Sequence, residues 1–226
     1  MGDVRGGSRD AAVAPLILKI VLPTIVEPWR ERIAACRTVA DVQDAQDYVV
    51  LDPACGSGNF LYVAYRELRR IEAELRRRAR DMRRSAGLRE QAALALYFPL
   101  TNIKGIELDP FAVQLARVTM WMGHKLAVDE LDLEENVLPL VDLSGIRRGD
   151  ALKLEWPRAD AIIGNPPYHG DRFLRRELGD EYVEWLKSEF GIGVQDYCVY
   201  WFRKALVRTL LATRNSDRVG MWPTSQ

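Results

Sequence analysis

The stretch that decides the fold is Tyr48-Val49-Val50-Leu51-Asp52-Pro53-Ala54-Cys55-Gly56-Ser57-Gly58-Asn59-Phe60. Its first four residues are apolar and rich in β-branched side chains, which predicts a buried strand of a parallel sheet. The two glycines of the turn allow φ > 0 and a close approach of the backbone to a ligand. From Asn59 to Met82 apolar residues recur at steps of three and four, so a long helix should follow.

A glycine turn of this kind is common in α/β proteins. Its sequence argues against some classes of ligand but does not identify one. The spacing is not the G-x-G-x-x-G of dinucleotide-binding folds, and the Lys-Ser/Thr ending of a P-loop is missing. Neither a pyrophosphate nor a triphosphate is therefore favoured.

Other apolar runs predict further strands along the chain. They cover residues 102–108, 145–150, 159–164 and 218–222, of which the second is weak. Strands that alternate with helices imply an α/β fold with a doubly wound, mostly parallel sheet, of the Rossmann-like type. In such sheets ligands bind beyond the carboxyl ends of the strands. Because the chain stops soon after the last predicted strand, we expect the C-terminal strands of the sheet to be missing.

Helical spacing predicts the elements between the strands. They cover residues 16–37, broken near Pro23 and Pro28, a short stretch at 92–97, and a strong amphipathic helix at 196–212. Asp109-Pro110 supplies an N-cap and a proline at the first helical position, which is a strong helix start. The buried face of the helix that starts there is predicted to consist of Phe111, Leu115, Val118, Met122 and Leu126.

Length and composition bound the class of protein. The 226 residues suit one domain, and we expect residues 15–226 to form it after a flexible tail at residues 1–14. The formal net charge is zero, so the overall charge gives no indication of a nucleic-acid partner. Three widely spaced cysteines outside any metal-binding pattern indicate a reduced, cytoplasmic protein without a metal site. No stretch is long and apolar enough for a membrane span.

Polar side chains follow three of the predicted strands. Gly164-Asn165-Pro166-Pro167-Tyr168 forms a rigid, oxygen-rich corner beside an aromatic ring, which suits a planar amide or exocyclic amine. Glu107 is placed to accept both hydroxyls of a ribose, and Asp150 to accept from an adenine amino group. An exposed strand-end glutamate and a turn-forming Gly-Asp pair are equally good interpretations of these two residues.

The order of these motifs resembles one known family. Asp-Pro-Ala-Cys-Gly-Ser-Gly-Asn-Phe-Leu, Ile-Glu-Leu-Asp-Pro, Gly-Asp and Asn-Pro-Pro-Tyr follow one another as in S-adenosylmethionine-dependent DNA adenine-N6 methyltransferases. The nearest resemblance is to the methyltransferase region of type IIG restriction–modification enzymes, and it covers roughly residues 16–226. The motifs are highly specific for methyl transfer to an amino group and less specific for DNA as the substrate.

The resemblance implies roles for individual residues. The methionine part of S-adenosylmethionine would be held by the loop containing Asp52, Ala54, Gly56 and Gly58. Glu107 would bind the ribose hydroxyls, Leu108 and Asp109 would flank the adenine ring, and Asp150 would bind its amine. The target amine would meet Asn165 and the Pro166 carbonyl, followed by Pro167, and Tyr168 would stack on the target base. Asp196 and Tyr197 match a pocket-lining motif more loosely.

The chemistry of an exocyclic amine supports these roles independently. Its lone pair is delocalised into the ring, so two acceptors that draw its hydrogens favour a more nucleophilic, tetrahedral nitrogen. Catalysis is then mainly in-line positioning and charge stabilisation, without a metal. An adenine paired in duplex DNA must first be flipped out of the helix, at a cost of a few kcal/mol.

Two departures from the family pattern leave other functions open. The usual Tyr-Thr segment before the first helix is replaced by Gly7-Ser8-Arg9-Asp10-Ala11. The closing antiparallel hairpin and any target-recognition domain are expected to be absent, so a downstream target-recognition domain or subunit is the expected partner. One alternative is a protein glutamine-N5 methyltransferase, which can use the same Asn-Pro-Pro-Tyr corner. Another is an inactive fragment or partner subunit that at most binds S-adenosylmethionine.

One charged stretch is also ambiguous. Residues 66–89 hold ten arginines and four acidic residues. Such a run is usually a solvated helix face, and the alternative is a surface that contacts DNA phosphates.

Overall fold

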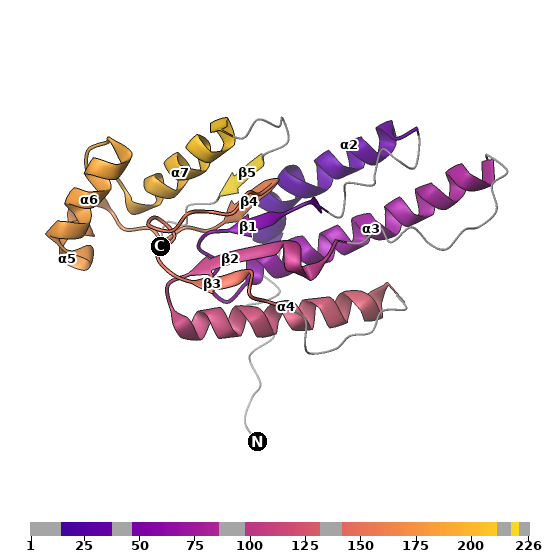
Figure 1. Ribbon diagram of the computed structural model, residues 1–226, viewed down its shortest axis with the longest axis horizontal. Coiled ribbons are helices and arrows are strands. Elements are labelled where there is room, and N and C mark those ends of the chain that lie inside the picture. Colours follow the sequence, from indigo (N-terminus) through magenta and orange to yellow (C-terminus); the bar gives the residue numbers. More distant parts are fainter. Residues whose placement is uncertain (1–14, 38–46, 86–97, 132–141, 212–217, 222–226) are drawn as a thin grey trace, which may run out of the picture.

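The computed structural model describes residues 15–37, 47–85, 98–131, 142–211 and 218–221. Within them lies a five-stranded sheet in the order β3-β2-β1-β4-β5, in which every neighbouring pair is parallel. The strands are β1 (Val50–Asp52), β2 (Ile103–Glu107), β3 (Ile146–Arg148), β4 (Ala161–Gly164) and β5 (Arg218–Met221). The predicted parallel α/β sheet is confirmed, and all five predicted strands are present (Figure 1).

The order in which the chain adds strands to the sheet reverses direction once. After β1, the chain passes through α3 to β2 and through α4 to β3, and then returns past β1 to β4 on the other side. The carboxyl ends of β1 and β4 therefore flank the point where ligands bind in open α/β sheets. The helices are η1 (Leu22–Val26), α2 (Glu27–Ala35), α3 (Asn59–Ser85), η3 (Leu100–Asn102), α4 (Pro110–Glu130), α5 (Asp171–Leu178), α6 (Asp180–Phe190) and α7 (Tyr197–Leu211).

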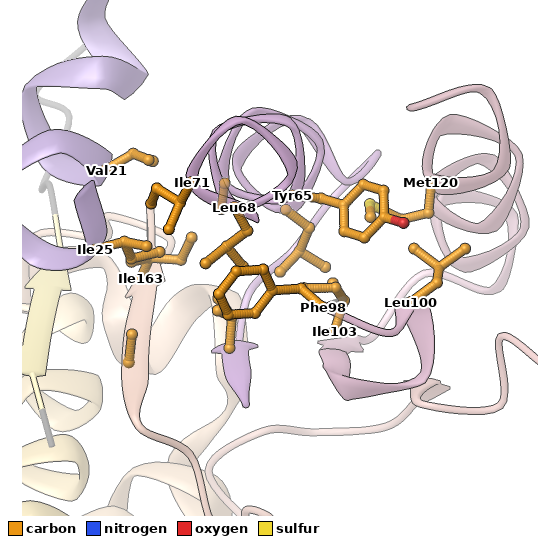
Figure 2. Close-up of a cluster of buried hydrophobic side chains, with 14 of the residues drawn as sticks. Val21, Ile25, Tyr65, Leu68, Ile71, Phe98, Leu100, Ile103, Met120 and Ile163 are labelled. Atoms are coloured by element: carbon orange, nitrogen blue, oxygen red, sulfur yellow. The ribbon is translucent and has the colours of Figure 1, made fainter. Parts of the chain in front are cut away.

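Alternation along the strands divides the interior into two cores. Val50 and Ile103 join the cluster formed with residues 15–36, α3 and α4. The neighbouring Leu51 and Ile106 point into a second cluster with α5, α6 and α7. Because successive side chains of a strand point to opposite faces, these residues show that both faces of the sheet are covered. Figure 2 shows the first cluster, in which Tyr65 and Leu68 of α3 lie between Ile25 and Met120.

The N-terminal helical segment is continuous where a break was predicted. Residues 15–21 are helical, and the chain passes through the π-helical η1 directly into α2. Pro23 and Pro28 both lie inside this continuous run, at the second position of η1 and of α2, and the residues between them form the π-helical turn. The prolines thus change the helix type and leave the axis uninterrupted. The predicted tail at residues 1–14 and the short helix at residues 92–97 lie outside the described residues.

The prediction for the buried face of α4 was wrong. The buried residues are Val113, Ala116, Met120, Gly123, His124, Ala127 and Val128. The five residues predicted to be buried are all exposed, by between 42% and 74%. The start of the helix is as predicted, because the Asp109 side chain accepts a hydrogen bond from Phe111 N.

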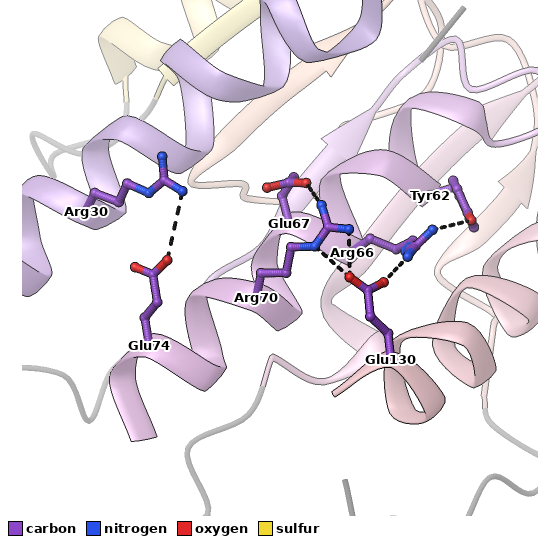
Figure 3. Close-up of polar contacts among 7 residues, drawn as sticks. All are labelled: Arg30, Tyr62, Arg66, Glu67, Arg70, Glu74 and Glu130. Carbon is purple, nitrogen blue, oxygen red and sulfur yellow. Dashed lines mark hydrogen bonds and ion pairs between the residues drawn. The ribbon is translucent and has the colours of Figure 1, made fainter. Parts of the chain in front are cut away.

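Several arginines of α3 are used to join helices. Arg66 and Arg70 both pair with Glu130 at the end of α4, as Figure 3 shows. Arg69 and Arg76 pair with Glu72, whose carboxylate also accepts from Phe98 N at 3.1 Å. In the first half of the basic run, four arginines are therefore paired with carboxylates within the domain, and of these Arg70 remains exposed.

Apart from Arg70, the exposed arginines of α3 lie toward its C-terminal end, at Arg77, Arg78, Arg80 and Arg84. A helix of 27 residues is roughly 40 Å long, so this end is far from the carboxyl end of β1, where α3 begins.

None of the helices in the described part of the chain is both long and apolar enough to cross a membrane.

Candidate active site

A pocket of about 380 Å³ lies beyond the carboxyl ends of the strands, at the switch between β1 and β4. Its size falls within the usual range for small-molecule sites, about 300–1,000 Å³. It is lined by Pro53, Ala54, Ile106, Glu107, Leu108, Gly149, Asp150, Ala151, Asn165, Pro167, His169, Leu178, Tyr197 and Trp201. The pocket thus brings together Ala54, Glu107, Leu108, Asp150, Asn165 and Pro167 of the residues predicted from the sequence.

The glycine turn has the backbone that the sequence predicts. Gly56 and Gly58 have φ angles of 52° and 86°, where residues with a Cβ are strained. A Cβ on Gly58 would lie 3.1 Å from the Ala116 Cα of α4, so the turn packs closely against that helix. Neither glycine lines the pocket itself. Together they set the path of the backbone around Ala54, which does.

Glu107 links the glycine turn to the start of α4. Its Oε2 accepts from Gly56 N and its Oε1 from Asp109 N, both at 2.9 Å. Two backbone donors fix the carboxylate, yet each oxygen keeps a further lone pair for a ligand hydroxyl. The side chain is partly exposed and lines the pocket.

The two residues after Glu107 differ in their surroundings. Leu108 lines the pocket and is 65% exposed. The carboxylate of Asp109 caps α4 and the side chain is exposed without lining the pocket. In this geometry Asp109 orders the helix start, while Leu108 presents an apolar surface to a ligand.

Asp52 is a buried carboxyl group with one oxygen unused. Its Oδ1 accepts from Ala54 N at 2.9 Å, while its Oδ2 has no hydrogen-bond partner within the described residues. Burial is the main cause that raises the pKa of Asp52 to about 7, the Ala54 N–H opposes it, and the negative charge of Glu107 adds to it. A buried carboxyl that lacks a donor is costly, so this oxygen marks a place where a cationic or hydrogen-bonding ligand would be stabilising.

The Asn-Pro-Pro-Tyr corner lies directly beside Asp52. A Cβ on Gly164, the residue before the corner, would lie 2.4 Å from Asp52 Oδ1, so only glycine allows this approach. Asn165 and Pro167 line the pocket, whereas Pro166 is buried next to them. The ends of β1 and β4 thus bring the two main motifs of the sequence into one site.

Tyr168 lies at the surface and is held from the start of α7. Its side chain is 50% exposed, and its hydroxyl is hydrogen-bonded to Asp196. The negative charge of Asp196, followed by that hydrogen bond, raises the pKa of Tyr168. Asp196 also accepts from Cys198 N at 3.3 Å, so the residue that orients the ring is itself fixed at the start of α7.

A chain of hydroxyl groups holds Asp150. Tyr182 donates to Asp150 Oδ2 at 2.7 Å, and the Tyr182 and Tyr197 hydroxyl oxygens are 3.1 Å apart. Since the single Tyr182 proton is used on the carboxylate, Tyr197 is the donor to Tyr182. Burial is the main cause that raises the pKa of both phenols, that of Tyr197 to about 12. Both remain neutral donors at physiological pH.

The turn after Asp150 is anchored by Lys204 of α7. Its ammonium donates to the carbonyl oxygens of Ala151, Leu152 and Leu154 at 2.9, 2.7 and 2.7 Å. Asp150 Oδ1 accepts from Leu152 N in the same turn. The adenine-binding residue predicted from the sequence is therefore positioned by both α6 and α7.

Sequence reasoning missed the helical pair α5 and α6 and the pocket residues Leu178 and Trp201. A signal was present, because Leu174 and Leu178 stand four residues apart, as do Tyr182 and Leu186. Gly179 and Gly191 end the two helices with positive φ. These short patterns predict two helices, but they do not reveal that Tyr182 reaches Asp150.

The sequence and the fold match a known domain family. The model of the family described as MmeI, DNA-methyltransferase domain, matches residues 36–218. The chain belongs to this family. The predicted resemblance to the methyltransferase region of restriction–modification enzymes is confirmed, and the chain is an enzyme domain of the DNA-methyltransferase class.

Two curated relatives show the extent of the similarity in sequence. DNA methyltransferase A of Bacillus subtilis (strain 168) is 31% identical over 167 residues, which make up 67% of this chain and 18% of that protein. The adenine-specific methyltransferase PglX of Streptomyces coelicolor is 28% identical over 155 residues, or 66% of this chain and 11% of PglX.

The solved structure of the type IIL restriction–modification enzyme MmeI in complex with DNA supports the fold. Its TM-score is 0.72 at 24% identity, over 93% of this chain and 29% of that one. The chain thus spans less than a third of the length of each of these three proteins.

Proposed function

We propose that residues 15–226 form a catalytic domain that transfers a methyl group from S-adenosylmethionine to the N6 amine of a flipped adenine in DNA. The observation that carries the proposal is one pocket at the β1–β4 switch that contains Glu107, Asp150 and Asn165. Two carboxylates suited to a nucleoside and one amide suited to a target amine thus face a common space. A restriction–modification or related defence system is the proposed setting, since MmeI is described as a restriction–modification enzyme.

The residues of the pocket fit S-adenosylmethionine. Asp52 is buried and does not line the pocket, but it directly precedes Pro53 and Ala54, which do, and its unsatisfied oxygen would suit the ammonium group of the methionine part. Glu107 has lone pairs left for two ribose hydroxyls, and Asp150 is held in place to accept from the adenine amine. Leu108 and the aromatic ring of Tyr197 supply apolar walls. When bound, S-adenosylmethionine supplies an activated methyl group on its sulfonium sulfur.

The target amine is proposed to bind at the Asn-Pro-Pro-Tyr corner. The Asn165 side-chain oxygen and the Pro166 carbonyl are acceptors for its two hydrogens, and accepting both localises the nitrogen lone pair. Pro166 and Pro167 restrict the backbone, so the two acceptors are fixed before the substrate arrives. Preorganised groups of this kind stabilise developing charge without reorganisation during the reaction.

Access to the corner explains why a flipped base is proposed. Tyr168 is half exposed and its hydroxyl lies near the Asp196 carboxylate, so the ring offers an accessible face for stacking. Stacking on an aromatic side chain is worth about 1–3 kcal/mol for a base, which offsets part of the few kcal/mol that flipping costs. The choice of DNA sequence is proposed to reside in a recognition segment or subunit, since the matched relatives are several times longer than the region they share with this chain.

Transfer of labelled methyl groups tests the proposal. The chain is incubated with tritiated S-adenosylmethionine and either mixed-sequence duplex DNA or a glutamine-containing peptide, followed by mass spectrometry of the nucleosides. We expect label in DNA as N6-methyladenine. Label in the peptide would instead establish the glutamine-N5 alternative. Binding of S-adenosylmethionine without transfer to DNA, in the presence of its recognition partner, would establish a binding subunit.

The hydroxyl chain to Asp150 gives a prediction for cofactor affinity. Tyr182→Phe removes the donor to Asp150 Oδ2, so the carboxylate is less well oriented. A hydrogen bond to a charged group contributes about 1.5–3 kcal/mol, so calorimetry should show about a tenfold or greater loss of S-adenosylmethionine affinity. Tyr62→Phe removes a hydroxyl that pairs with Arg66 on α3 and serves as the matched control. Equal affinities in the two variants would contradict the role of Tyr182.

A further inference from the structure

The outer face of α4 carries an apolar stripe that no described residue covers. The stripe consists of Phe111, Leu115, Val118, Met122 and Leu126, each between 42% and 74% exposed. Their spacing of four, three, four and four residues places them on one side of the helix over four turns. In Figure 1, α4 forms one side of the molecule, with no described element beyond it.

The opposite face of α4 is fixed, so the stripe cannot be buried by turning the helix. Ala116 packs on Gly58, and Gly123 packs on Tyr62, where an added Cβ would lie 2.8 Å from the ring. His124 Nδ1 and Tyr65 OH form a buried hydrogen bond of 2.8 Å between α4 and α3. The outward position of the stripe is therefore built into the core.

The size of the stripe suits a protein interface. Five such side chains, each about half exposed, present on the order of 400–500 Å² of apolar surface. A standard interface buries about 800 Å² on each partner, of which the core is about two-thirds apolar. The stripe therefore provides roughly the apolar area that one side of such an interface contains.

We propose that this face pairs with the same face of a second copy of the chain, with the two α4 helices antiparallel. The spacing of the four outer residues is self-complementary, because reversal of the helix about a point just after Val118 exchanges Phe111 with Leu126 and Leu115 with Met122, and it leaves Val118 beside the axis, opposite Thr119. A two-fold interface requires this property, since each residue of one copy meets its counterpart on the other. The net charge of zero leaves no overall repulsion between two copies.

The arrangement keeps both active sites open. α4 begins next to the pocket, at Asp109 and Leu108, and runs away from it for 21 residues, or about 30 Å. Antiparallel pairing places the two pockets at opposite ends of the helix pair. The proposal is independent of the proposed function, because it concerns neither the pocket nor its ligands.

Engineered cysteines test the register of the pairing. The native cysteines are buried, so they give little background. Val118→Cys should form a disulfide with its own counterpart near the two-fold axis. Phe111→Cys and Leu126→Cys should each fail to do so alone and should cross-link when the two variants are mixed, because a disulfide requires Cβ atoms about 3.5–4.5 Å apart. Self-cross-linking of all three variants would show parallel pairing and would overturn the proposal.

Sedimentation equilibrium tests the interface itself. The chain should dimerise at concentrations of about 1–100 μM, and the double variant Leu115→Lys with Met122→Lys should weaken dimerisation by at least about 100-fold. Leu206→Lys, at an exposed leucine of α7, is the matched control and should leave the dimer intact. All three substitutions are at exposed positions, so melting temperatures measured well below the dissociation constant of the dimer, where every variant is monomeric, should be unchanged. A monomer throughout this range, or equal dimerisation in the double variant, would overturn the proposal.

Discussion

The variant Asn165→Ala is expected to lose methyl transfer while it keeps the ability to bind S-adenosylmethionine. Asn165 is a polar residue of the pocket located at the end of β4, on the side of the Asn-Pro-Pro-Tyr corner. Removal of its side-chain oxygen leaves the Pro166 carbonyl as the remaining acceptor for the target amine. Loss of one preorganised hydrogen-bonding group at a reacting atom typically lowers kcat by about 10²–10³-fold.

Single-turnover transfer of labelled methyl groups measures this loss directly. Calorimetric titration with S-adenosylmethionine should give a Kd close to that of the unchanged chain, because the nucleoside and methionine parts are proposed to bind other residues. Asn102→Ala, at the end of η3 and on the amino side of β2, is a matched control that should leave the rate nearly unchanged. A rate in Asn165→Ala within about threefold of the parent would mean that positioning alone, without this acceptor, provides the catalysis.

The strand-end residues of the site were predictable because the sequence encodes them locally. An apolar run followed by glycine or a helix cap specifies a strand and its end, and parallel strands bring their ends to one edge. Glu107, Asp150 and Asn165 are each within one residue or two of such an end, and all three line the pocket. The order of the motifs alone therefore sufficed to place them together.

The orientation of α4 was not predictable from its pattern, for a physical reason. The helix is apolar on two sides, and a periodicity argument favours the side with the larger residues. Close approach to α3 instead requires small ones, and Ala116, Gly123 and Ala127 supply that surface. The face of α4 that packs most densely against α3 is the buried one, and the sequence of α4 alone does not show which face that is.

The residues that position Asp150 could not be predicted from the sequence, because they lie far from it along the chain. Tyr182 is 32 residues away and Lys204 more than 50, and both act only after α6 and α7 have packed on the sheet. No local pattern states which tyrosine of an amphipathic helix will reach a carboxylate. Such contacts follow from tertiary structure alone.

Cofactor binding is expected to become tighter as the pH rises through about 7, because Asp52 then loses its proton. Burial raises the pKa of Asp52 to about 7 from an ordinary value of 3.8. The ammonium group of the methionine part, like other α-amino groups, stays charged to about pH 7.7–8.0. At pH 6 only about a tenth of the Asp52 side chains are ionised, so affinity should be about tenfold lower than its plateau near pH 7.5.

The same pKa makes the free domain less stable at higher pH. The folded chain retains a proton on Asp52 that the unfolded chain releases near pH 4, so the stabilising effect is full below about pH 4 and is lost as the pH rises through about 7. Asp52→Asn removes this ionisation and keeps an acceptor for Ala54 N. Its melting temperature without ligand should exceed that of the parent chain at pH 8, and the difference between the two chains should shrink as the pH falls from 7 toward 4.

Combined measurement of binding and stability separates the two effects of Asp52. In Asp52→Asn, affinity for S-adenosylmethionine at pH 8 should fall by about 10–100-fold, because a charge-assisted hydrogen bond of about 1.5–3 kcal/mol is lost. The pH dependence of affinity between 6 and 7.5 should disappear with it. A variant that gains stability but binds as tightly as the parent would show that the carboxylate is strained without serving the ligand, and that the ammonium group binds elsewhere in the glycine turn.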